Sequence, residues 1–105
     1  MRHLYVLVRT DLTPAQQMVQ AVHAAIEAAR IDKAGSHPHL VLCQVRSELE
    51  LLQACHSLEA AGMRCALFRE PDLGQQATSL ATCALDQSAR ASLQKILRKF
   101  PLWKG

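Results

Sequence analysis

Short apolar runs alternate along this chain with longer segments of helical periodicity, and this alternation restricts the fold more than any other property of the sequence. His3–Val8 (HLYVLV) is apolar without strict alternation, as expected for a strand covered on both faces. From Pro14 to about Ile31, apolar residues recur at three- and four-residue spacing, which predicts an amphipathic helix. The pattern then repeats, because His39–Val45 (HLVLCQV) predicts a second buried strand and Glu48–Ala61 a second helix.

Capping residues support both helices. Either Thr10 or Thr13 can cap the first helix, which has Pro14 in its first turn, where a missing N–H does no harm. Ser47 followed by Glu50 is a capping-box pattern, and Gly62 supplies a stop for the second helix.

The second half of the chain predicts two strands joined without a helix. Arg64–Phe68 is a third strand, Glu70–Gln76 (EPDLGQQ) is a turn rich in Pro, Asp and Gly, and Leu80–Leu85 is a fourth strand. A last helix is expected from Asp86 or Ser88 to about Lys99.

The predicted order is therefore β-α-β-α-β-β-α. In a chain of 105 residues this order implies a single α/β domain spanning residues 1–105. We expect a three-layer sandwich with a four-stranded mixed sheet flanked by helices. The early crossovers predict parallel strands, and the direct connection between the last two strands predicts one antiparallel strand.

Composition narrows the function classes. Cys43, Cys55, Cys65 and Cys83 show no CxxC pattern and no zinc-ligand spacing, which predicts free, mostly buried thiols, no metal and no cofactor. The N-terminal apolar run is too short for a signal peptide or a membrane span, so a cytoplasmic protein without a membrane partner is expected. No glycine-rich phosphate loop of the dinucleotide or P-loop type is present in the sequence.

The C-terminal end is basic. The net charge is +3, and the last sixteen residues carry five cations, Arg98 and Lys99 among them, and no acid. This end either contacts RNA phosphates or is a solvated helix end whose cations suit the helix dipole. The terminal sequence FPLWKG either packs back on the sheet or forms a partner surface, and a homodimer is expected because two-fold homo-oligomers are common.

Two segments together are similar to the type II peptidyl-tRNA hydrolases. LVRTDL followed by VQAVHAA resembles that family's first strand and helix signature, and Gln20 and His23 match its Gln and His. FREPDLGQQATSLATCAL resembles the second signature. The residues that match it are Asp72, Gly74, Thr78 and Thr82. The resemblance covers nearly the whole chain and agrees with the four-stranded mixed sheet predicted above.

The resemblance implies a hydrolase that cleaves the ester between a peptidyl or N-blocked aminoacyl group and tRNA, with tRNA as the partner. Such a reaction needs a base for water and donors for the oxyanion. The residues expected in catalysis are His23, Asp72, Asp11 and Thr82. Those expected to bind substrate are Gln16, Gln20, Gly74, Thr78, Arg98 and Lys99.

Three features favour a different interpretation. Gln16 occupies the position of a lysine regarded as functional in the family, the stretch TPAQQ that contains it is two residues shorter than the family's, and Gln76 stands where a threonine is expected. Glutamine cannot carry the positive charge that holds a phosphate or an oxyanion. The alternative is thus a weakened or inactive relative that acts as an RNA- or protein-binding module. In that case Asp11 is a helix cap, His23 a half-buried structural histidine and Asp72 a turn former.

Overall fold

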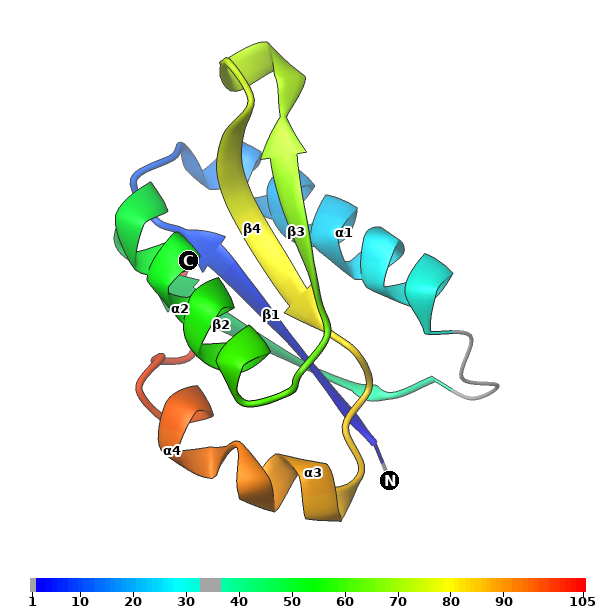
Figure 1. Cartoon of the computed structure of the whole chain (residues 1–105). Coiled ribbons are helices and arrows are strands. Elements are labelled where there is room, and N and C mark those ends of the chain that lie inside the picture. Colours follow the sequence, from blue (N-terminus) through cyan, green and yellow to red (C-terminus); the bar gives the residue numbers. More distant parts are fainter. Residues whose placement is uncertain (1, 33–36) are drawn as a thin grey trace.

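The computed structural model describes residues 2–32 and 37–105 and shows the predicted α/β fold (Figure 1). The sheet contains β1 (His3–Arg9), β2 (His39–Val45), β3 (Cys65–Glu70) and β4 (Gln76–Thr82), in the order β2-β1-β4-β3. β1 and β2 are parallel, whereas β4 is antiparallel to both β1 and β3. β3 therefore runs parallel to β1, so their carboxyl ends lie at the same end of the sheet.

Helices cover both faces of the sheet. α1 (Pro14–Ile31) packs on one face, against β1, β3 and β4. α2 (Glu48–Ala60) covers the other face together with α3 (Gln87–Ser92) and α4 (Gln94–Leu97). This is the three-layer sandwich that the sequence predicts.

β1 is buried on both faces, as its unalternated apolar sequence indicates. Leu4 and Val6 face α1, where alanines of the helix let its backbone approach the sheet closely. Tyr5 and Leu7 face the larger core beneath α2, which also contains Leu93 and Leu97. Burying these side chains on both faces is the main favourable contribution to folding.

The helix ends agree with the capping prediction. The Thr13 hydroxyl accepts a hydrogen bond from the Gln16 N–H, and the Gln16 side chain accepts one from the Thr13 N–H, so Thr13 and not Thr10 caps α1. Ser47 caps α2 by accepting the Glu50 N–H, but the predicted capping box is not complete, because the Glu50 side chain accepts the Arg46 N–H instead. Gly62 follows the helix with a φ of 85°, a conformation that glycine adopts without strain.

Two predicted boundaries were wrong. The fourth strand spans Gln76–Thr82 rather than Leu80–Leu85, because β3 continues to Glu70 and pairs directly with Gln76 across a tight turn. That turn is the short 3-10 helix η1 (Pro71–Leu73), followed by Gly74 and Gln75, both with a φ of 64°. The last helix is likewise two short helices, α3 and α4, broken at Leu93.

The cysteines are free and mostly buried, as the sequence predicts, and the C-terminal tail takes the first of its two predicted arrangements. All four thiols are free, with Cys43 and Cys55 buried and the other two partly buried. Burial raises the pKa of the Cys65 thiol to about 12, so it is a poor nucleophile at neutral pH. The C-terminal tail packs back along the edge of β2, where the Trp103 N–H donates to the Leu42 carbonyl.

Candidate active site

A buried arginine organises the carboxyl end of the central strand. Arg9 ends β1, and its guanidinium donates to both carboxylate oxygens of Asp11, with the atoms 2.8 and 2.9 Å apart. Its remaining nitrogen donates to Gln76 Oε1 at 2.8 Å and to the Ala77 carbonyl at 3.1 Å. The hydrogen bond from Arg9 lowers the pKa of the Asp11 carboxyl. Asp11 is therefore occupied by the guanidinium that joins β1 to β4, and Thr13 rather than Asp11 caps α1.

Gln20 joins α1 to β4 through a second buried polar network. Its side-chain amide donates to Glu70 Oε1 at 2.8 Å and accepts the Thr78 hydroxyl at 2.6 Å, while its backbone carbonyl accepts the Ser79 hydroxyl at 2.6 Å. Thr78 is fully buried. Because every polar group of this network has a partner, its first role is to fix the helix on the sheet.

A cavity lies beside this network, at the carboxyl end of β3. It has a volume of about 270 Å³ and its lining includes Gln16, Gln20, Glu70 and Asp72. Asp72 is exposed in η1, and no described residue donates a hydrogen bond to its carboxylate. The Gln16 side-chain oxygen caps α1, which leaves its NH₂ group as a donor.

His23 lies in an adjoining groove on the same side of α1. Its ring stacks on Phe68 of β3, with the ring centroids 4.4 Å apart and the planes inclined by 6°. Val19 lines both this groove and the Asp72 cavity, so the two hollows are neighbours. His23 is half-buried and makes no hydrogen bond to Asp72.

The other predicted site residues lie elsewhere. Thr82 is fully buried at the opposite end of β4, where its hydroxyl accepts the Tyr5 N–H at 3.1 Å. Gly74 is exposed and provides the left-handed residue of the η1 turn. Arg98 and Lys99 follow α4, in the layer on the other side of the sheet from α1. Neither Thr78 nor Thr82 therefore presents its hydroxyl to a substrate, and the predicted catalytic residues do not surround one cleft.

The structure thus groups Asp72 with Gln16 and Gln20 and places His23 next to them. Sequence reasoning missed the central role of Arg9. The sequence does contain a signal for this role: Arg9 ends an apolar strand, and Asp11 follows two positions later. A buried arginine is rarely without an acid, so this pair could have been predicted to form an ion pair.

A scan against protein-family models found no family that matches the chain, and a search of curated proteins found no relative. Within residues 2–32 and 37–105, no group of three or more His, Cys, Asp or Glu side chains is arranged to hold a metal ion. No helix of the described chain is long and apolar enough to cross a membrane.

Proposed function

We propose that this chain is a divergent relative of the type II peptidyl-tRNA hydrolases and cleaves the ester between an N-blocked aminoacyl or peptidyl group and tRNA. The observation that carries the proposal is the cavity that Asp72 lines together with Gln20, which matches the family signature, and Gln16, which stands at the position of the family lysine. The mixed four-stranded sheet with helices on both faces also supports it. A tRNA substrate makes the cytoplasm the expected location.

The chemistry assigned to this cavity is attack of water on the ester carbonyl. The Asp72 carboxylate accepts a proton from the attacking water, and the free NH₂ of Gln16 donates to the oxyanion that develops. When the tetrahedral intermediate collapses, the bond between the acyl carbon and the ribose oxygen breaks, and Asp72 returns its proton to that oxygen as the tRNA leaves. A neutral amide stabilises an oxyanion less than an ammonium group does, so a slow enzyme is expected. The groove beside His23 lies where the acyl group or terminal base of the substrate would extend.

The test is release of N-acetylated amino acid from acyl-tRNA by purified protein. Asp72→Asn should lower the rate by about 100-fold, the lower end of what a positioned base contributes. Gln16→Lys should raise the rate, because it restores a positive charge near the oxyanion. Glu59→Gln, which neutralises an exposed acid on α2 away from the cavity, is the matched control and should leave the rate unchanged.

The results of this assay distinguish a hydrolase from a non-catalytic binding module. If wild type and Asp72→Asn release N-acetylated amino acid at the same rate, Asp72 is not the base in this reaction. No release by wild type or by Gln16→Lys, while a known hydrolase cleaves the same substrate, would reject the hydrolase.

The second candidate is a non-catalytic module that binds protein, and an exposed apolar surface on α1 favours it. Met18, Val22 and Ile26 lie one turn apart on α1 and are 63%, 58% and 53% exposed, and Leu40 of β2 is 66% exposed. Gln17, Met18, Val22, Leu40 and Trp103 also line a hollow of about 300 Å³ between α1 and β2. An exposed apolar surface of this kind is typical of an interface.

We assign a second copy of this chain as the partner. From Pro14 to Ile26 the helix carries no charged side chain, although the chain has a net charge of +3. A two-fold contact brings the same surface of both copies together, so it requires a surface without self-repulsion. This surface also holds both projecting side chains and a hollow that can receive them.

Sedimentation velocity tests the homodimer. Val22→Lys should shift the protein from dimer to monomer, because the contact would bury an unpaired charge in each copy. Leu49→Lys is the matched control, since Leu49 is 66% exposed on α2, and it should leave the dimer intact. A wild type that sediments as a monomer at every concentration would reject the assignment.

A further inference from the structure

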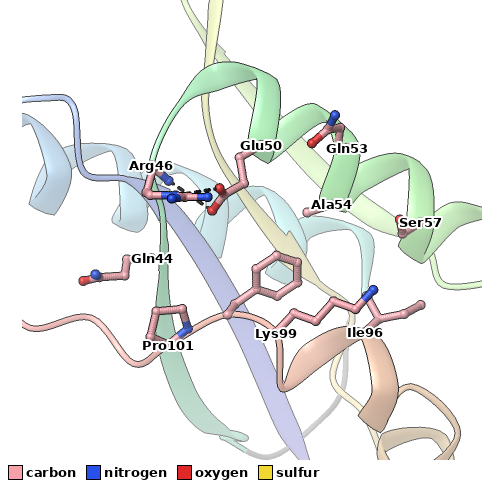
Figure 2. A pocket seen from close by; sticks show the side chains of 10 residues that line it. Gln44, Arg46, Glu50, Gln53, Ala54, Ser57, Ile96, Lys99 and Pro101 are labelled. Carbon is pink, nitrogen blue, oxygen red and sulfur yellow. Dashed lines mark hydrogen bonds and ion pairs between the residues drawn. The ribbon is translucent and has the colours of Figure 1, made fainter.

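A second cavity lies on the opposite side of the sheet from the Asp72 cavity. It has a volume of about 550 Å³ and opens between α2 and the segment Ile96–Pro101 (Figure 2). The residues that line it are Gln44, Arg46, Glu50, Gln53, Ala54, Ser57, Ile96, Lys99, Phe100 and Pro101. Its volume falls within the range of small-molecule sites.

The charged groups of this pocket leave a positive excess. Arg46 donates through Nε to Glu50 at 3.0 Å, which leaves both terminal nitrogens of the guanidinium as donors. No described acid forms an ion pair with Lys99. Two cations against one acid favour an anionic ligand.

The rest of the lining combines apolar surface with amide and hydroxyl groups. Phe100 is half-buried and lines the pocket together with Ile96 and Pro101. Gln53 and Ser57 project from α2 above it in Figure 2, and both are exposed. Proteins that bind single-stranded nucleic acids use such groups: a base stacks on an aromatic ring, and amide groups form hydrogen bonds with the edge of the base.

The placement of the two cations suits a nucleotide within a strand. In Figure 2 the two cations lie apart among the side chains that are drawn, Arg46 beside Glu50 and Lys99 beside Ile96. A nucleotide in single-stranded RNA has a phosphate on each side of its base, whereas a free nucleoside monophosphate has only one. We propose that this pocket binds a nucleotide, with its base against Phe100 and phosphate on Lys99 and Arg46, supplied by single-stranded RNA.

This site is independent of the Asp72 chemistry, because none of its lining residues lines the Asp72 cavity. It binds RNA whether or not the chain hydrolyses an ester. Asp72→Asn should therefore retain full RNA affinity, and failure of the hydrolase proposal would leave this one standing.

The experiment is fluorescence anisotropy with a labelled single-stranded pentaribonucleotide at low salt. Lys99→Gln should weaken binding about tenfold, because one phosphate contact is lost while the side chain stays polar. Phe100→Leu keeps the apolar volume but removes the stacking surface, and it should weaken binding about fivefold or more. Lys95→Gln is the matched control: it removes the same charge from α4, outside the pocket, and should change the affinity less than about twofold.

Competition identifies the source of the nucleotide. Displacement by an unlabelled oligonucleotide but not by millimolar AMP would support a strand, and displacement by AMP as well would support a nucleotide pocket open to free ligand. The proposal is overturned if Lys99→Gln and Lys95→Gln weaken binding equally, if polyglutamate displaces RNA as well as the oligonucleotide does, or if no RNA binds. Lys99 is exposed, so its variant remains informative even if Phe100→Leu unfolds the protein.

Discussion

Arg9 shows how one residue can determine the chemistry available at the end of a sheet. Its side chain is only 8% exposed, yet it carries a full charge, so it must be paired inside the fold. Asp11, Gln76 and the Ala77 carbonyl accept its hydrogen bonds, and Glu48 accepts the Ala77 N–H at 2.7 Å from the neighbouring helix. The same pairing occupies the Asp11 carboxylate, whereas no described residue donates a hydrogen bond to the Asp72 carboxylate.

Asp11→Asn should destabilise the protein in a pH-dependent way. The pKa of the Asp11 carboxyl is lowered from 3.8 in the folded state, so its contribution to stability is complete above that value and is lost as the pH falls through the lower folded pKa. Because the Asp11 side chain is 42% exposed, the expected loss at pH 7 is about 1 kcal/mol. Urea unfolding from neutral to acidic pH measures the difference.

The wild-type and Asp11→Asn unfolding curves should therefore converge at acidic pH. Asp72→Asn is the control, because that carboxylate has no described donor, and its stability should stay within about 0.5 kcal/mol of wild type. A difference for Asp11→Asn that persists below the folded pKa would show that the ion pair is not its cause.

At the scale of the elements, α1 is joined to the sheet by polar contacts in addition to apolar packing. Gln20 is buried on the helix face that otherwise presents Ala24 and Ala28 to the sheet. It accepts the hydroxyls of Thr78 and Ser79, so two polar residues can lie in a fully buried part of β4. The position of α1 over the Asp72 cavity follows from this contact.

Thr78→Val should test this docking contact. The substitution keeps the side-chain shape but leaves Gln20 Oε1 without its hydroxyl donor, which should cost about 1–3 kcal/mol in the free energy of unfolding. Ser92→Ala, which removes an exposed hydroxyl bonded to Ser88 on α3, should cost less than about 0.5 kcal/mol. A loss for Thr78→Val as small as the control would mean that the network does not fix the helix.

The same contact explains why the sequence predicts some elements better than others. The limits of α1 and β2 follow from local signals, namely the Thr13 cap and an apolar run, and both were predicted correctly. β4 begins with Gln76, which the sequence assigns to the turn, and it contains Thr78 and Ser79, which lie before the predicted strand. Only the distant Gln20 makes those hydroxyls compatible with burial, and no window of neighbouring residues contains that information.

The candidate site could likewise be predicted from the sequence only in part. Asp72 and Gln16 are brought together because β3 is parallel to β1, which follows from the predicted topology. Thr82 was misplaced because the β4 boundary was wrong, and its register with Cys65 puts it at the far end of the sheet. The pocket beneath α2 depends on how the chain turns after α4, which apolar periodicity does not specify.

For the whole molecule, the C-terminal tail closes an exposed sheet edge. β2 is an edge strand, and an unpaired edge invites association with other chains. The Pro101 carbonyl accepts the Gln44 N–H at 3.0 Å, and the Trp103 N–H donates to the Leu42 carbonyl at 2.9 Å. The Trp103 indole also donates to Gln17 Oε1 at 2.7 Å, so the tail bridges β2 and α1.

Removal of residues 101–105 should lower the free energy of unfolding by about 2 kcal/mol or more, because two edge hydrogen bonds and the partly buried indole are lost together. It should also increase light scattering, since the uncovered edge can pair with other chains. Removal of residues 104–105 alone is the matched control, because it keeps Pro101 and Trp103 in place, and it should stay close to wild type. If both truncations unfold at the same urea concentration as the full chain, the tail is not part of the stable fold, and Trp103 would then be free to leave the hollow where the second copy is expected to bind.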